Sequence, residues 1–118
     1  MNATRTVLVV DDNPLVSNVI EEFLKSHDFN VVCARDGIAA LSLIDAHRID
    51  LAVVDLLLPG PLSGDDVAAH AVDRNVKVII ISGALASDTR GRDIRHPHLL
   101  KPFRMDVLLK TIESTFAA

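Results

Sequence analysis

The chain has 118 residues, of which 49% are hydrophobic, so it can form one compact domain with a buried core and has little room for a second. Its formal net charge is −4, from 12 basic and 16 acidic residues, and the scattered basic residues argue against direct binding to nucleic acid. Its apolar runs are too short to cross a bilayer and the N-terminus lacks a signal-peptide region, so we expect a cytoplasmic protein with no membrane contact. Cys33 is the only cysteine, which excludes an internal disulfide, and we expect it in the core.

Four short runs rich in β-branched residues recur along the chain, at residues 7–10, 31–34, 51–54 and 78–81. They show no alternation of apolar and polar residues, which is typical of parallel strands that are buried on both faces. The apolar pair Leu99 and Leu100 predicts a short fifth strand.

Segments between these runs carry apolar residues at the spacing of amphipathic helices. Start signals agree, because Pro14 suits a first helical turn and Asp36 can cap a helix. Ser63 and Asp66 have the spacing of a capping box. The apolar stripes consist of Leu15, Val19, Ile20, Phe23 and Leu24, of Ile38, Leu41 and Ile44, of Val67, Ala68, Ala71 and Val72, and of Met105, Leu108, Leu109, Ile112 and Phe116.

The segment at residues 84–97 has the weakest pattern, because few of its residues are apolar and Gly91 interrupts a run of charges. We expect a short or frayed helix there. Strands and helices otherwise alternate along the chain, with no internal repeat and no linker. The pattern therefore predicts an α/β fold, a doubly wound parallel sheet with helices on both faces.

Polar side chains follow the predicted strands. Asp11 and Asp12 come after the first strand, Asp55 after the third, Ser82 after the fourth and Lys101 after the fifth. Because ligands of doubly wound sheets bind beyond the carboxyl ends of the strands, we expect these residues to converge. Three carboxylates there would repel one another and raise each other's pKa unless a cation neutralised them. Oxygen ligands with positions left for water and phosphate suit Mg²⁺ better than zinc.

This set of residues resembles the receiver domains of two-component response regulators. The resemblance spans essentially the whole chain, so residues 1–118 are expected to form one receiver domain, with no output domain in this chain. It implies the flavodoxin-like receiver fold, whose five strands lie in the order 2-1-3-4-5. The motifs that carry it are Asp11-Asp12, Asp55 followed by Pro59 and Gly64, Ser82-Gly83, and Lys101-Pro102-Phe103.

The resemblance also implies roles for the acidic residues. Asp55 would be the nucleophile that takes a phosphoryl group from a phosphohistidine of a sensor histidine kinase or histidine phosphotransfer protein. Asp12, Asp55 and the backbone carbonyl of Leu57 would bind Mg²⁺ directly, and Asp11 would act mostly through a coordinated water. The chain would then be a signalling phosphoacceptor rather than an enzyme.

Lys101 would pair with a phosphoryl oxygen, and the bond from Lys101 to Pro102 would be cis, which aims the lysine inward. The Ser82 hydroxyl would be drawn to the new phosphoryl group. In the family this movement shifts a surface that binds a partner protein. The chain would be a monomer or a dimer that forms on phosphorylation, with an unidentified downstream effector.

Three features depart from the family pattern. His98, three residues before Lys101, occupies a position where these domains usually carry Tyr or Phe, which puts aromatic coupling in doubt. The loop at residues 60–63 is one residue longer than the common pattern. Leu57 and Ala84 cannot orient an attacking water by hydrogen bonding, so we predict a long-lived phosphoryl state.

Three other functions are weighed against this one. A pseudo-receiver would keep the fold without phosphorylation, and the intact acid set argues against it. A metal-dependent phosphohydrolase that uses an aspartyl phosphate usually shows D-x-D and a long cap insertion, whereas Asp11 and Asp12 are adjacent here. A flavin-binding module would need a hydroxyl-rich phosphate loop after the first strand, which this chain lacks.

Overall fold

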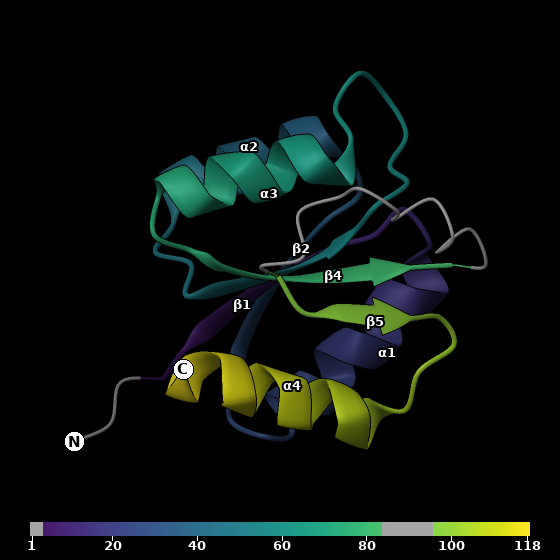
Figure 1. Ribbon diagram of the computed structural model, residues 1–118, viewed down its shortest axis with the longest axis vertical. Helices are drawn as coiled ribbons and strands as arrows, with labels where there is room; N and C mark the ends of the chain where they lie inside the picture. The colour runs from purple at the N-terminus through teal and green to yellow at the C-terminus, as the bar shows by residue number, and fades with distance from the viewer. Residues whose placement is uncertain (1–3, 84–95) are drawn as a thin grey trace.

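The computed structural model describes residues 4–83 and 96–118, and these ranges contain five strands and four helices. Each predicted strand is present and is one or two residues longer than expected. The expected helix at residues 84–97 lies outside the described residues, apart from His96 and Pro97. The elements are β1 (Thr6–Val10), α1 (Pro14–Lys25), β2 (Asn30–Ala34), α2 (Gly37–Ala46), β3 (Leu51–Asp55), α3 (Gly64–Asp73), β4 (Lys77–Ser82), β5 (His98–Leu100) and α4 (Met105–Ala117) (Figure 1).

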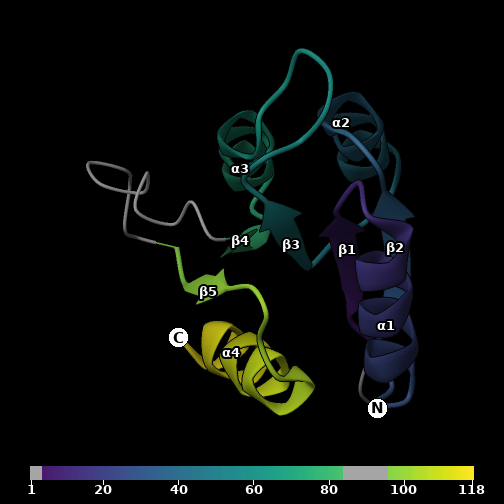
Figure 2. The same cartoon turned by 90° about the vertical axis from the view of Figure 1, so that its right-hand side faces the viewer.

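All five strands are parallel and lie in the order β2-β1-β3-β4-β5, which confirms the predicted order. Figure 2 looks at the edge where the strands end, with β3 between β1 and β4. The register aligns Val10 with Val54, and Asp55 with Ile81. Residues that directly follow β1, β3 and β4 are therefore brought to the same edge.

Helices cover both faces of the sheet, with α2 and α3 on one side and α1 and α4 on the other (Figure 2). Side chains of a strand alternate between these two layers, as the pleat requires. In β1, Leu8 and Val10 belong to the core under α2 and α3, whereas Val7 and Val9 belong to the core under α1 and α4. The prediction of strands buried on both faces is confirmed for β1, β3 and most of β4.

The same prediction is wrong for β2, one of the two edge strands. Cys33 in β2 is exposed rather than in the core, and His98 and Leu100 in β5 are exposed as well. Each of these strands has a neighbour on one side only, so the helices shield it less completely. An unbroken apolar run does not distinguish an edge strand from a central one.

The helix start signals are confirmed. Pro14 opens α1, and the side chain of Asp36 accepts a hydrogen bond from the Ala39 N–H at the start of α2. Ser63 and Asp66 form both halves of a capping box on α3. These caps fix where each helix begins relative to the end of the preceding strand.

The apolar stripes of the helices are narrower than the sequence spacing indicates. Ile20 and Leu24 of α1 and Leu108 and Ile112 of α4 are fully buried, in the same core. Several stripe members face solvent instead, because a helix that rests on a sheet buries only one narrow side. Those exposed members are Leu15, Val19, Ile38 and Val72. Among residues 4–83 and 96–118, no helix is long and apolar enough to cross a membrane.

Gly64 lets α3 begin directly against the end of β3. A Cβ atom there would collide with the backbone oxygen of Asp55 and come within 2.7 Å of the Leu56 Cα atom. We expect Gly64→Ala to lower the free energy of unfolding by roughly 1–3 kcal/mol in urea denaturation, because backbone must move. Gly83→Ala is the matched control, since a Cβ at Gly83 meets no atom of residues 4–83 or 96–118 within 4 Å. Equal losses for the two variants would contradict this close approach.

Candidate metal centre at the carboxyl edge of the sheet

Three carboxylates meet where β1 and β3 end. Asp11 follows β1 directly, Asp12 is next, and Asp55 is the last residue of β3. One oxygen atom from each lies within 4.8 Å of the others. Asp11 is 1% exposed and Asp55 6% exposed, whereas Asp12 faces solvent. The convergence expected from strand order is thus present, with one open side at Asp12.

Lys101 reaches this cluster from the loop after β5. Its Nζ atom donates hydrogen bonds to Asp11 Oδ2 at 2.7 Å and to Asp55 Oδ2 at 2.8 Å. Its backbone N–H donates to the Ser82 carbonyl oxygen at 2.6 Å, which ties this loop to the end of β4. The peptide bond from Lys101 to Pro102 is cis, as predicted. The lysine therefore points into the site, not into solvent.

The titration behaviour of Asp55 and Lys101 reflects this crowding. Burial raises the pKa of Asp55, and the charge of Asp11 raises it further. Hydrogen bonds from Lys101 and from the Leu57 N–H lower this pKa, but they do not outweigh burial. Burial alone would lower the pKa of Lys101, but its bonds to Asp11 and Asp55 and their negative charges outweigh burial and raise it. Lys101 is therefore held in its charged form, as the cation between two buried carboxylates.

The other predicted residues that the structure describes lie at the end of β4, just after β3 and at the start of β5. Ser82 is the buried last residue of β4. Leu57, two residues after Asp55, is 63% exposed, and its N–H donates to Asp55 Oδ1 at 3.2 Å. Ala84 lies outside the described residues, and His98 stands exposed at the start of β5.

Asn13 belongs to the site and was not singled out from the sequence. Its N–H donates to Asp11 Oδ1 at 2.9 Å, and its own side chain caps α1 through the Leu15 N–H. Asp11 is therefore held by Asn13 on one oxygen and by Lys101 on the other. An asparagine directly before Pro14 is a helix-start signal that could have indicated this position.

The donor set fits a hard divalent cation. Three carboxylates and one ammonium group carry a formal charge of −2, which is the charge that Mg²⁺ neutralises. The donors are oxygen atoms, which Mg²⁺ prefers, and the exposed side at Asp12 leaves room for the waters that it retains. The site has the chemistry of a magnesium centre.

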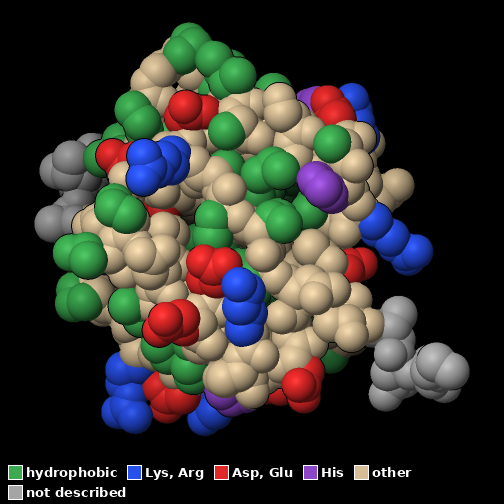
Figure 3. Space-filling model, turned by 180° about the vertical axis from the view of Figure 1, so that it is seen from behind, with side chains coloured by type: hydrophobic (Ala, Val, Ile, Leu, Met, Phe, Trp, Pro, Cys, Tyr) green, Lys and Arg blue, Asp and Glu red, His purple; other side chains and the backbone are tan. Residues whose placement is uncertain are grey.

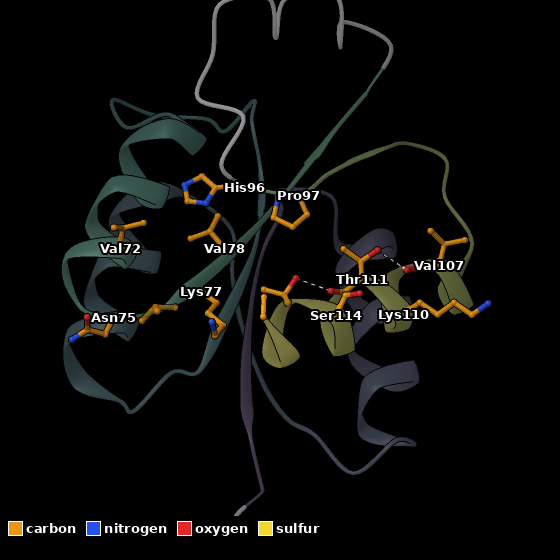
Figure 4. Close-up of a pocket in the computed structure, with 13 residues that line it drawn as sticks. Val72, Asn75, Lys77, Val78, His96, Pro97, Val107, Lys110, Thr111 and Ser114 are labelled. Carbon is orange, nitrogen blue, oxygen red and sulfur yellow. Dashed lines mark hydrogen bonds between the residues drawn. The ribbon is translucent and has the colours of Figure 1, made fainter.

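A separate groove of about 950 Å³ lies between α3 and α4, beside the first half of β4 (Figure 4). Val72 and Val78 line one side of it, and Val107 and Thr111 line the other. None of its described lining residues is acidic, and none belongs to the carboxylate cluster. This groove therefore offers no alternative carboxylate site.

Fold and site together define a doubly wound α/β protein with an acidic, lysine-bridged edge. The family model of the response regulator receiver domain matches residues 7–113. The chain belongs to this family and is a receiver domain of the two-component response regulators. Members of that family characteristically act as phosphoacceptors in signalling.

Curated relatives are similar over nearly the whole chain. The chain is 29% identical over 112 residues to response regulator RR06 of Streptococcus pneumoniae, covering 92% of this chain and 51% of that protein. It is 29% identical over 114 residues to transcriptional regulatory protein PdtaR of Mycobacterium tuberculosis, covering 92% and 55%. The chain thus spans about half the length of these relatives.

Solved structures agree with this assignment. A response regulator receiver protein from Sinorhizobium medicae has a TM-score of 0.86 and 28% identity, covering 98% of this chain and 96% of that one. The receiver domain of a sensor histidine kinase from Pseudomonas aeruginosa has a TM-score of 0.85 and 26% identity, covering 98% and 100%. That structure has a magnesium ion coordinated in its active-site cleft.

Asp55→Asn tests the electrostatics of the metal-free site. Because burial raises the pKa of Asp55, the native state retains a proton that the unfolded state releases near pH 3.9. Wild-type stability therefore falls, relative to the variant, as pH rises from about 4 through the raised pKa of Asp55. Urea denaturation in chelator should show the variant gaining on wild type as pH rises above about 4. If the free energy of unfolding of the wild type instead rose relative to that of the variant as pH increased, the raised pKa would be contradicted.

Proposed function

We propose that this chain accepts a phosphoryl group on Asp55, with the help of Mg²⁺, in a two-component system or phosphorelay. One observation carries the proposal, namely that Asp55 ends β3 beside two further carboxylates and 2.8 Å from the Lys101 ammonium group. A carboxylate nucleophile, a cation site and a lysine are the groups that phosphoryl transfer requires.

The metal ligands in this proposal are those that the resemblance to the family implies, and the three carboxylates among them do lie together. Asp12, Asp55 and the backbone carbonyl of Leu57 would bind Mg²⁺ directly, and Asp11 would act mostly through a coordinated water. When bound, the ion supplies positive charge beside the phosphoryl oxygens. Asn13 and Lys101 would hold Asp11 in place, since each donates to one of its oxygens.

Transfer forms one bond and breaks another. A carboxylate oxygen of Asp55 attacks phosphorus in line with the departing nitrogen of a phosphohistidine, so the P–N bond breaks as the O–P bond forms. Lys101 would then exchange its bond to Asp55 for one to a phosphoryl oxygen. The Ser82 hydroxyl would donate to another phosphoryl oxygen, which draws the end of β4 toward Asp55.

The partner would be a sensor histidine kinase or a histidine phosphotransfer protein. Phosphorylation would shift the population of a protein-binding surface on this domain, either as a monomer or as a dimer that forms on phosphorylation. The effector would be a protein, because the net charge of −4 disfavours direct contact with nucleic acid. A cytoplasmic location is part of the proposal.

Incubation with acetyl phosphate and Mg²⁺, read by intact mass, tests the proposal. We expect one phosphoryl adduct on the wild type and none on Asp55→Asn, because the amide is not a nucleophile toward phosphorus. Asp73→Asn is the matched control, since Asp73 is an exposed aspartate at the end of α3. It should be phosphorylated like the wild type.

The other possible results of this phosphorylation experiment lead to different conclusions. Adduct on Asp55→Asn would contradict the assignment of the acceptor. No adduct on the wild type would favour a pseudo-receiver, and continuous turnover of the donor would favour a phosphohydrolase. Omission of Mg²⁺ should abolish the adduct, because the charge of the site would stay uncompensated.

The lifetime of the phosphoryl group depends on Leu57. Its apolar, exposed side chain cannot orient a water toward the phosphorus, so the wild-type adduct should persist well beyond seconds at neutral pH. Leu57→Asn supplies a hydrogen-bonding amide and should shorten the lifetime severalfold, whereas Leu57→Ala should not. The decay of the adduct mass after removal of the donor measures this. Wild-type hydrolysis within seconds would count against the prediction.

A further inference from the structure

We infer that a contact between Leu62 and Gly37 positions the backbone of Leu57 and thereby sets the Mg²⁺ affinity of the site. The inference rests on the proposed function, in which the Leu57 carbonyl binds the metal. It concerns the β3–α3 loop, residues 56–63, which protrudes at the top right of Figure 1. Apolar side chains gather at the tip of this loop, at the top of Figure 3.

Both ends of the β3–α3 loop are fixed by backbone hydrogen bonds. The Leu56 N–H donates to the Ile81 carbonyl at 3.0 Å, and the Gly64 N–H donates to the Leu56 carbonyl at 3.1 Å. The Ser63 N–H donates to Asp66 Oδ2 at 2.8 Å, which locks the residue after Leu62 onto α3. A displacement of Leu62 is therefore blocked on the α3 side and must be taken up toward Leu57.

Gly37, the first residue of α2, is buried under the loop. A Cβ atom at this position would lie 2.5 Å from the Leu62 Cβ and 3.2 Å from the Leu62 carbonyl oxygen. Both atoms belong to or adjoin the backbone, so no side-chain rotation relieves the collision. The backbone of Leu62 thus rests on Gly37, and only glycine leaves room for it.

The link between this contact and Leu57 is short and stiff. Pro59 and Pro61 flank Gly60, and each proline ring fixes one backbone torsion. Gly60 already has a φ of 87°, a conformation that glycine adopts readily. Leu58, which directly follows Leu57, packs against the core under α2 and α3, so a shift of the turn that moves Leu58 also moves the backbone of Leu57. A shift of Leu62 is thus transmitted along the turn to Leu57.

A double-mutant cycle measures this coupling. Gly37→Ala should weaken Mg²⁺ binding roughly tenfold, a typical loss when a group that orients a ligand is disturbed. In a Leu62→Gly background, which lacks the opposing Cβ, the same substitution should have little effect. Affinities come from Mg²⁺ titrations followed by backbone amide NMR shifts, which also report on Leu57 directly. Ile38→Ala, an exposed change on the same turn of α2, is the matched control.

The outcomes separate this inference from the proposed function. Urea denaturation of each variant reports stability, and a loss of stability with unchanged Mg²⁺ affinity would overturn the positioning role. If Gly37→Ala does not fold, Leu62→Gly alone removes the Cβ that rests on Gly37 without touching α2, and it should also weaken Mg²⁺ binding. A wild type that binds no Mg²⁺ would contradict the proposed function, whereas tight binding by every variant would contradict only the inference.

Discussion

The repulsion among three carboxylates at one edge of the sheet is the constraint on which the site depends. Asp11 and Asp55 are both buried, so water cannot screen their charges, and the Lys101 ammonium group bridges them at 2.7 and 2.8 Å. One ammonium group leaves the cluster short of positive charge. In the proposed function, a divalent cation supplies the missing positive charge, and Asp55 then accepts a phosphoryl group beside it.

The fold makes this arrangement possible by fixing the ends of the strands. Cores on both faces hold β1 and β3 in register, which places Asp11 and Asp55 side by side. The helices then begin where the strands end, with Asn13 and Ser63 capping α1 and α3. The caps and glycines around the site therefore determine its geometry as well as the stability of the domain.

Local chemistry made much of this predictable from the sequence. Runs of β-branched residues without polar interruptions indicated the strands. Aspartates directly after the first and third of these runs indicated the cluster of carboxylates. Cys33 was misplaced because an apolar run does not tell whether its strand lies at an edge, and Leu15 was misplaced because helical spacing does not tell how wide a stripe the sheet covers. The contact of Leu62 with Gly37 had no sequence signal, since it joins two segments only through the folded chain.

Anomalous diffraction from crystals grown with Mn²⁺, a stand-in for Mg²⁺, tests the central claim most directly. The account predicts a peak in contact with the carboxylates of Asp12 and Asp55 and with the carbonyl oxygen of Leu57. A strong peak elsewhere, or none there while Lys101 still bridges Asp11 and Asp55 at saturating Mn²⁺, would contradict it.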